Sequence, residues 1–358
     1  GAPAPLAPPA TPPGPLRWRA SIHGAASGVY GEQAVADAFA DAGFGRPVTT
    51  DDWDLLWTNR PMQKLLDSKA LPEKRTSRIV NHCDYFKAAG QKCRFATHLR
   101  NVRQSLGLGA KLQRWALGAP RSLQTYHLMK ADDISSWQAA MAKNPDRYWL
   151  LKNCTGAKSS GIVLARLEDK DVIARHLKTF TVAQEYLQRP LTSDGKKFHA
   201  RLYLLITRWS PVSLFLYDEG VVFRSRHAYA AGRVPSMERD IFSGVSSDVE
   251  PLKFSSVMAA FGAQGAVAAT AKIADVLAEL FGNALEESFG DAGAPDKKAY
   301  ACFDVFAADV LFDEELQPHI LELNMGADLS YDAADKQHSA VLREVKEPLL
   351  TQLAAIGA

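Results

Sequence analysis

The sequence predicts an α+β protein that has two or three lobes. Its 358 residues are 47% hydrophobic and 23% charged, which is enough apolar material for a large core. Residues 305–311 and 320–323 are rich in β-forming apolar residues and flank an acidic turn at 313–318, the pattern of two buried strands. Residues 265–281 instead repeat apolar side chains at helical spacing, which predicts a helix packed against a sheet.

The charge balance excludes some classes of partner. The 42 Lys and Arg residues against 40 Asp and Glu leave a net charge of +2, so nothing global indicates nucleic acid or an anionic membrane. No apolar run approaches the length that spans a bilayer. We therefore expect no nucleic-acid partner and no membrane association.

The four cysteines are scattered through the chain. Cys83, Cys93, Cys154 and Cys302 form no Cys-x-x-Cys pair, a pattern that fits reduced thiols better than a disulfide framework or a zinc site. Reduced thiols predict a cytoplasmic protein.

The first part of the chain has the pattern of a tail followed by a small lobe. Residues 1–15 are rich in Pro and Ala without the pattern of a signal peptide, and we interpret them as a flexible tail. Residues 16–22 and 51–58 are predicted strands, with a helix through Val35 and Phe39 between them that ends near Gly43. Together they predict a β-α-β unit.

A basic segment follows a short predicted strand at residues 78–82. Such a run of cations usually forms a solvated face, although it can also flank a phosphate or an acidic peptide. The cations are Lys87, Lys92, Arg94, His98, Arg100 and Arg103.

A polar loop at residues 153–160 joins two predicted strands, 148–152 and 161–164. The loop contains Gly156 and Lys158, and the first strand ends in Lys152. Backbone N–H groups and Lys158 of such a loop can cover a triphosphate while Lys152 reaches the phosphates. The loop is not a P-loop, because the Gly-x4-Gly-Lys-Ser/Thr motif and its helix are missing. The alternative is an ordinary Gly-containing hairpin.

Residues 198–206 form a predicted strand with one cationic face. Because side chains alternate along a strand, Lys197, His199, Arg201 and Tyr203 share one face, and the apolar residues share the other. A buried Arg201 needs an anionic partner such as a phosphate or a carboxylate. His199 is either a satisfied histidine at the edge of the core or a group that senses the transferred phosphate.

Two further strands, 213–217 and 220–224, are predicted to form a hairpin about residues 218–220, with Gly220 at a position of positive φ. Residues 340–353 form a last predicted helix, broken or kinked at Pro348.

Oxygen-bearing side chains gather on the two predicted strands at 305–311 and 320–323. Glu322 and Asn324 are two residues apart and so share one face, and Asp309 can meet them from the neighbouring strand. Two carboxylates and an amide carbonyl suit Mg²⁺, which completes its shell with water and substrate phosphates. An ordinary hairpin whose acids face water is the alternative.

The order and spacing of these pieces resemble the tubulin tyrosine ligase-like family of ATP-grasp ligases. The resemblance runs from about residue 27 to residue 329. The matching pieces are 78–82 (Arg-Ile-Val-Asn-His), 148–152 (Tyr-Trp-Leu-Leu-Lys) with Gly156 and 161–162, 184–187 (Gln-Glu-Tyr-Leu), 195–203 (Gly-Lys-Lys-Phe-His-Ala-Arg-Leu-Tyr), 217–220 (Tyr-Asp-Glu-Gly), and 309–311 (Asp-Val-Leu) with 321–324 (Leu-Glu-Leu-Asn).

The resemblance implies an ATP-grasp fold with an N-terminal lobe (16–76), a central lobe (77–183) and a C-terminal lobe (184–358), with the nucleotide between the last two. It also implies roles for individual residues: phosphate binding by Lys152 and Lys197, adenine binding by Gln184, Glu185, Tyr186 and Leu187, and Mg²⁺ binding by Asp309, Glu322 and Asn324. Arg201 is expected to stabilise charge on an acylphosphate, with His199 and Arg224 also at the catalytic site.

Besides Asn153 and residues 325–326 (Met-Gly), where the change is tolerable, the sequence departs from the family pattern at three places. His199 replaces the Asp of Lys-Phe-Asp-x-Arg. Phe223 stands where an Arg is expected, and Arg224 follows one position later, on the other face of the strand unless a bulge intervenes. Residues 240–245 replace a Leu-Thr-Asn stretch. These departures bear on the acceptor and on the amino acid.

The family implies an ATP- and Mg²⁺-dependent ligase that adds a free amino acid to a peptide or protein carboxylate through an acylphosphate. By resemblance, the acceptor is an acidic tail such as that of tubulin, and we expect a monomer. Two alternatives are a nucleotide-binding pseudo-ligase that acts as a protein-binding module and an ATP-grasp ligase for a small metabolite.

Overall fold

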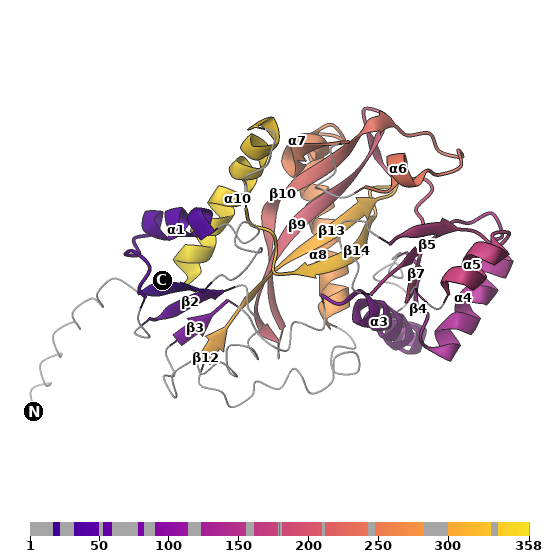
Figure 1. Cartoon of the computed structure of the whole chain (residues 1–358), viewed down its shortest axis with the longest axis horizontal. Helices are drawn as coiled ribbons and strands as arrows, with labels where there is room; N and C mark the ends of the chain where they lie inside the picture. The colour runs from indigo at the N-terminus through magenta and orange to yellow at the C-terminus, as the bar shows by residue number, and fades with distance from the viewer. Residues whose placement is uncertain are drawn as a thin grey trace, which may run out of the picture.

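In the residues that it describes, the computed structural model contains three β-sheets with packed helices (Figure 1). These residues are 17–21, 32–49, 53–58, 78–81, 90–113, 123–154, 161–177, 179, 181–209, 212–242, 248–282, 300–330 and 336–357. The strands are β1 (Trp18–Ser21), β2 (Leu55–Thr58), β3 (Arg78–Val80), β4 (Thr125–His127), β5 (Trp149–Lys152), β6 (Val163–Ala165), β7 (Val182–Glu185), β8 (Thr192–Ser193), β9 (Lys196–Trp209), β10 (Val212–Ala228), β11 (Val249–Lys253), β12 (Tyr300–Cys302), β13 (Asp304–Phe312) and β14 (Pro318–Met325). The helices are α1 (Glu32–Asp41), α3 (Lys92–Gln113), α4 (Ala131–Lys143), α5 (Lys170–His176), α6 (Met237–Asp240), α7 (Phe254–Ala259), α8 (Gly265–Gly282) and α10 (Lys336–Gly357).

The first sheet is parallel and has the order β1-β2-β3-β12. The predicted β-α-β unit supplies β1, α1 and β2, and Gly43 after α1 has a φ of 87°, the left-handed conformation that ends many helices. Its last strand, β12, comes from far along the chain, and β3 lies beyond the predicted boundary at residue 76. The predicted tail at 1–15 lies outside the described residues.

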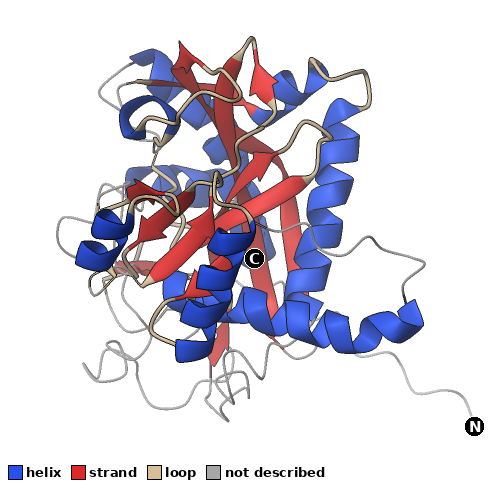
Figure 2. Ribbon diagram, turned by 90° about the vertical axis from the view of Figure 1, so that its right-hand side faces the viewer, coloured by secondary structure: helices blue, strands red, loops and turns tan. Residues whose placement is uncertain are grey.

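The largest sheet is antiparallel, with the order β11-β10-β9-β13-β14 and β8 paired to β9. Helices pack on both of its faces (Figure 2). Phe198, Ala200 and Leu202 of β9 pack against α7, α8 and α3 on one face, while Tyr203 and Leu205 belong to the core formed with α1 and α10 on the other. The predicted alternation of β9 is therefore confirmed.

The third sheet has the order β4-β7-β5-β6 and carries α4 and α5. Its core centres on Trp137 and Trp149, whose rings meet edge to face with centroids 6.3 Å apart. Strand β7 spans the predicted lobe boundary at 183/184 and pairs entirely within this sheet. The division into three lobes stays a prediction, since sheet membership alone does not define it.

The predicted hairpin at 213–224 is wrong. Residues 212–228 form the single strand β10, in which Leu216 pairs with Leu204 and Gly220 already pairs with Leu202, so residues 217–219 bulge opposite Tyr203. Gly220 does not need a positive φ. A Cβ at this position would lie 2.5 Å from Leu202 Cδ2 and 2.7 Å from the Arg201 carbonyl oxygen, so close approach to β9 requires glycine.

The prediction of reduced thiols is also wrong, because Cys93 and Cys154 form a disulfide and Cys302 is disulfide-bonded as well. Scattered spacing gave no sign of the pairing, because the fold brings α3 against the residues that follow β5. Helix α10 runs unbroken through Pro348. Among the described helices, none is both long enough and apolar enough to cross a membrane.

Candidate nucleotide and metal site

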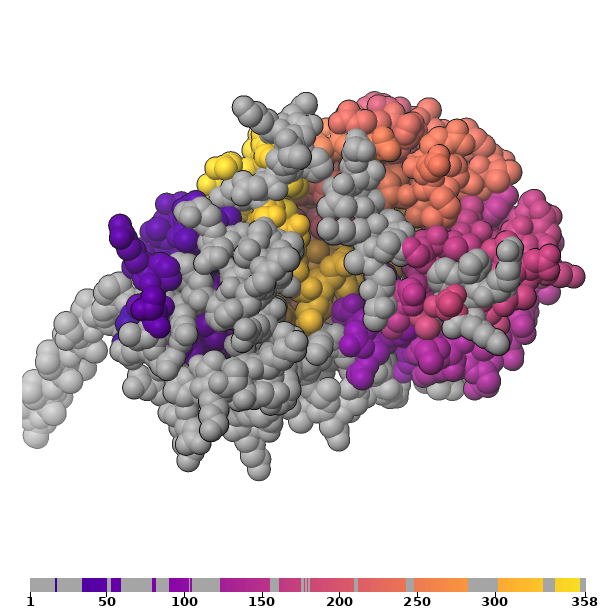
Figure 3. All heavy atoms as spheres, viewed as in Figure 1, coloured from indigo at the N-terminus to yellow at the C-terminus, as the bar shows by residue number. Residues whose placement is uncertain are grey.

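The predicted metal ligands come together on β13 and β14. Asp309 pairs directly with Glu322 across the two antiparallel strands, and Ala307 pairs with Asn324. The Asn324 side-chain amide donates a hydrogen bond to Asp309 Oδ2 over 3.2 Å. These strands lie near the centre of the molecule, between the parallel sheet and the α4–α5 sheet (Figure 1). Gold atoms of this part of the chain are visible there in the space-filling view (Figure 3).

Asp309 is held by a bidentate ion pair with Arg201. Arg201 Nε donates to Oδ1 and Nη2 donates to Oδ2, each over 2.8 Å. Burial alone would raise the pKa of Asp309, but the adjacent guanidinium outweighs burial and keeps that pKa below its ordinary value. The anionic partner expected for Arg201 is therefore the predicted metal carboxylate, and Asp309 is ionised at neutral pH.

Glu322 has a cation partner of its own. Lys92 Nζ, near the start of α3, lies 2.8 Å from Glu322 Oε2. Helix α3 can approach β14 this closely because Gly90 lies against Met325, where a Cβ would be only 2.8 Å from the Met325 Cβ. Lys92 is thus a site residue that the sequence showed only as one member of a cationic run.

The donor set fits Mg²⁺. No group of three or more Asp, Glu, His or Cys side chains placed to hold a metal occurs in the described residues, so a metal here would rely on two carboxylates and an amide oxygen. Mg²⁺ is commonly held by one or two carboxylates, with water and substrate phosphates completing the shell. Asp309, Glu322 and Asn324 provide that partial set on adjacent strands.

Lys152 lies at the end of β5 and is buried. Its Nζ donates to Gln184 Oε1 over 2.7 Å, and burial lowers its pKa. Gln184 Nε2 in turn donates to Thr125 Oγ1 at 3.3 Å and to the Leu321 carbonyl at 3.1 Å. The Gln184 side chain therefore links the α4–α5 sheet to the metal-site strand β14.

The other predicted adenine-binding residues follow Gln184 along the chain. Glu185 forms an ion pair with Arg147 at 3.0 Å and accepts a hydrogen bond from the Gln124 backbone N–H at 3.2 Å. Tyr186 is buried and Leu187 is half-buried. The segment contacts both predicted phosphate-binding lysines: Gln184 accepts a hydrogen bond from Lys152, and the Tyr186 hydroxyl accepts one from Lys197. The role of the four residues toward adenine stays a prediction.

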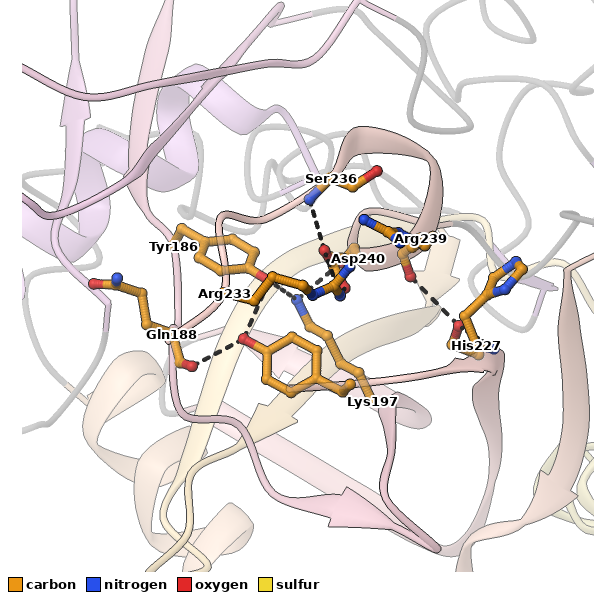
Figure 4. A network of polar contacts seen from close by, with 10 residues as sticks. Tyr186, Gln188, Lys197, His227, Arg233, Ser236, Arg239 and Asp240 are labelled. Carbon is orange, nitrogen blue, oxygen red and sulfur yellow. Dashed lines mark hydrogen bonds and ion pairs between the residues drawn. The ribbon is translucent and has the colours of Figure 1, made fainter. Parts of the chain in front are cut away.

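Lys197 is enclosed by protein oxygen atoms and aromatic rings (Figure 4). Its Nζ donates to the Asp240 carbonyl over 2.9 Å and to the Tyr186 hydroxyl over 3.2 Å, and it lies 4.3 Å from the centroid of the Tyr186 ring. Burial lowers the pKa of Lys197 to about 7. Sequence reasoning missed the role of residues 229–242 here, where Tyr229 also donates to the Gln188 carbonyl over 2.8 Å.

His199 lies between two aromatic rings. Its ring centroid is 5.3 Å from that of Phe223 on β10 and 5.4 Å from that of Phe242 after α6. Burial lowers the pKa of His199 to about 4, so the imidazole is neutral at pH 7. Of the two interpretations left open for His199, the environment resembles that of a core-edge histidine, although the residue borders Arg201.

One predicted catalytic residue, Arg224, is not brought to this cluster. Arg224 follows Phe223 and so projects from the opposite face of β10, where it binds Glu250 at 2.6 Å, Ser193 at 3.0 Å and Asp194. The pairing of β10 with β9 is continuous from Phe223 to Arg224, so no bulge restores Arg224 to the His199 face. Lys158 lies outside the described residues.

The sequence profile of the tubulin-tyrosine ligase family matches residues 78–240 and 283–356. The chain belongs to this family. This confirms the resemblance drawn from the motifs. A relative named tubulin polyglutamylase ttll6, from Danio rerio, is 25% identical over 330 residues, covering 84% of this chain. A probable tubulin polyglutamylase, ttll-9 of Caenorhabditis elegans, is 25% identical over 299 residues, covering 78% of this chain and 69% of the relative. The match spans only 38% of the Danio rerio relative.

Among solved structures, this chain is similar to the C-terminal domain of K. lactis Pby1, which is described as an ATP-grasp enzyme interacting with the mRNA decapping enzyme Dcp2. The two align with a TM-score of 0.60 and 16% identity, covering 95% of this chain and 92% of the other. This tubulin-tyrosine ligase family chain therefore has the predicted α+β ATP-grasp fold.

Proposed function

We propose that this protein is an ATP-dependent carboxylate–amine ligase that adds a free amino acid to a peptide or protein carboxylate and releases ADP. The observation that carries the proposal is the convergence of Lys152, Lys197 and Arg201 with Asp309 and Glu322 around adjacent strands. Phosphoryl transfer depends mainly on such positioning of cations and metal ligands.

The chain's own residues would hold ATP and Mg²⁺ in the following way. Lys152 and Lys197 would exchange their present protein acceptors for phosphate oxygens, with Lys158 as a further candidate. Gln184, Glu185, Tyr186 and Leu187 would border the adenine. Asp309, Glu322 and Asn324 would hold Mg²⁺, which, when bound, supplies positive charge to the phosphate oxygens.

The reaction would run in two displacements. An acceptor carboxylate oxygen attacks the γ-phosphorus of ATP, and the bond from this phosphorus to the β,γ-bridging oxygen breaks. The products of this step are an acylphosphate and ADP. The amine of the amino acid then attacks the acyl carbon, the carbon–oxygen bond to phosphate breaks, and the surplus amine proton passes to water. Arg201, which is paired with Asp309, would stabilise the negative charge that develops on the acyl group.

The names of the relatives support an acidic protein tail as the acceptor. Because the relatives that cover most of this chain are named tubulin polyglutamylases, we take an acidic tail like that of tubulin as the acceptor. We keep the expectations of a monomer and of a cytoplasmic location, although the latter no longer has support from reduced thiols.

ADP release tests the proposal. Purified protein with ATP, Mg²⁺, a panel of amino acids and either tubulin or a polyglutamate peptide should release ADP over many turnovers only when donor and acceptor are both present. Asp309→Asn should abolish release, whereas Asp275→Asn, at an exposed position on α8, should leave it unchanged. Equal release by the wild type and Asp309→Asn would refute the assignment of the site.

A pseudo-ligase that binds nucleotide without turnover is the second candidate, favoured by the neutral His199 packed between two rings. Tight binding of ATP without ADP release under the full panel would support it. His199→Asp separates the two: a large gain of ADP release would mark His199 as the cause of lost turnover. If free amino acids alone serve as acceptors, the protein is instead a ligase for a small metabolite.

A further inference from the structure

Residues 229–242, which follow β10 and include α6, lie across Lys197 (Figure 4). We call this segment the strap. Its Asp240 carbonyl accepts a hydrogen bond from Lys197 Nζ over 2.9 Å, and the centroids of the Tyr186 and Tyr229 rings lie 4.3 and 5.8 Å from the same atom. Lys197 is left only 5% exposed. A phosphate oxygen must come within about 2.8 Å of Nζ to accept a hydrogen bond, so one of these groups has to move before it can bind.

Of the groups around Lys197, the strap is the one least held by packing. Lys197 lies on β9, which is hydrogen-bonded to β10 on one side and to β13 on the other, and Tyr186 is 2% exposed. By contrast, every residue from 230 to 239 except Pro235 is exposed or half-buried, and Val234 is 63% exposed. Segments with few buried apolar contacts open with the smallest change in free energy. The strap is therefore the part that moves.

An ion pair within the strap holds its two ends together. Arg233 Nη2 lies 2.9 Å from Asp240 Oδ1 and 3.3 Å from Oδ2, and the Ser236 backbone N–H donates to Oδ2 over 2.6 Å. The Asp240 side chain is only 2% exposed, and a buried carboxylate is stable only while such donors compensate its charge. Since the same residue supplies the carbonyl that binds Lys197, the ion pair also keeps the strap on the lysine.

The Tyr229 hydroxyl attaches the other end of the strap. It donates a hydrogen bond to the Gln188 carbonyl over 2.8 Å. Gln188 directly follows residues 184–187, which are predicted to bind adenine. The strap thus connects the predicted adenine segment to a predicted phosphate-binding lysine.

We propose that the strap closes the nucleotide site in the free protein and opens before nucleotide binds, with the Arg233–Asp240 ion pair as its latch. The inference rests on the proposed ligase function and adds a conformational control of nucleotide entry. Opening takes the Asp240 carbonyl away from Lys197 and leaves Nζ for a phosphate oxygen. Because only the open form binds, the apparent affinity is lowered in proportion to the fraction of protein that is open.

Stopped-flow fluorescence with a fluorescent, non-hydrolysable ATP analogue and Mg²⁺ tests the inference. In the wild type, the observed rate should level off as the analogue concentration rises, because opening of the strap then limits binding. Arg233→Met leaves the buried Asp240 carboxylate without its cation, so the limiting rate should rise by about 10-fold or more. Tyr229→Phe removes one hydrogen bond and keeps the ring, so it should fold and raise the limiting rate by about 3-fold.

Arg226→Met is the matched control, because it also removes one positive charge, from an exposed residue of β10 just before the strap. It should leave the limiting rate unchanged. The inference is overturned if the wild-type rate rises linearly with concentration, or if the limiting rate is unchanged in Arg233→Met, or in Tyr229→Phe should Arg233→Met not fold. If the analogue binds to none of these proteins, the proposed function fails and the inference fails with it; if it binds with such kinetics, the inference alone fails.

Discussion

Two lysines at the site are buried and donate their hydrogen bonds to uncharged oxygen atoms. Lys152 donates to an amide oxygen and Lys197 to a carbonyl and a hydroxyl. Removing a charged amine from water favours its neutral form, and the pKa of both lysines is lowered for this reason. An anionic phosphate that binds beside either lysine would favour its charged form and raise its pKa again.

The lowered pKa of Lys197 predicts that the protein takes up protons when it binds the nucleotide. Its pKa is lowered to about 7, so at pH 8.5 the free protein holds Lys197 mostly neutral, and a bound phosphate would raise that pKa again. The affinity for an ATP analogue should therefore fall as pH rises above about 7. Calorimetry at pH 8.5 in two buffers of different ionisation enthalpy measures the proton uptake directly.

Lys197→Met should bind the analogue more weakly and take up fewer protons than the wild type. Lys143→Met is the control, because Lys143 is an exposed residue in the last turn of α4. An unchanged uptake in Lys197→Met would show that this lysine does not meet the phosphates.

Replacing Arg201 should lower the stability of the protein as well as its activity. Arg201→Met leaves Asp309, which is 6% exposed, without its bidentate partner. We expect the free energy of unfolding to fall by about 3 kcal/mol, the usual cost of stranding a buried charge. Urea denaturation measures it. Since the guanidinium keeps the pKa of Asp309 low, the loss should shrink at acidic pH where the carboxyl is protonated in the variant; a loss independent of pH would contradict this account.

At the scale of elements, the bulge in β10 sets the position of the catalytic face of β9. Glu219 in the bulge accepts the backbone N–H groups of Gly220 at 3.0 Å and Ser255 at 2.9 Å, which ties β10 to the start of α7. Gly220 itself touches the Arg201 backbone. The contacts of Glu219 hold the bulge of β10 in place, and the contact of Gly220 with Arg201 sets how closely β9 lies against β10.

Gly220→Ala should therefore displace β9. Its Cβ would lie 2.7 Å from the Arg201 carbonyl oxygen, and backbone cannot yield as a side-chain tip can. We expect a loss of about 2 kcal/mol in the free energy of unfolding, together with weaker binding of the ATP analogue. Gly45→Ala is the control, because nothing lies within 4 Å of the Cβ added there. Equal stabilities of the two variants would contradict the prediction.

Elements whose pattern is local were predictable from the sequence, and those set by distant contacts were not. The alternation of β9 and the spacing of α8 are properties of neighbouring residues, so both were predicted correctly. The apparent turn at Gly220 is a bulge because β9 pairs along the whole of β10. In the same way, strand alternation predicted that Glu322 and Asn324 share one face, whereas Lys92 and Phe242 reach the site through tertiary packing.

Across the whole molecule, α3 joins parts that lie far apart in sequence. Lys92 pairs with Glu322 on β14, and the adjacent Cys93 is bonded to Cys154 just after β5. His98, one to two turns later, binds the Leu280 carbonyl of α8 at 2.7 Å. One helix thus connects the metal strand, the α4–α5 sheet and the helical face of the large sheet.

The disulfide in this connection should contribute to global stability. It closes a loop between residues separated by 61 positions, and such a cross-link lowers the entropy of the unfolded chain by an amount worth about 4 kcal/mol. Cys93→Ser/Cys154→Ser should therefore unfold at lower urea concentration than the wild type, both without reductant. Because Cys93 lies beside Lys92, the variant should also bind the ATP analogue and Mg²⁺ more weakly. Peptide mapping of the unreduced wild type checks the bond itself, and alkylation of both thiols in that protein would rule it out.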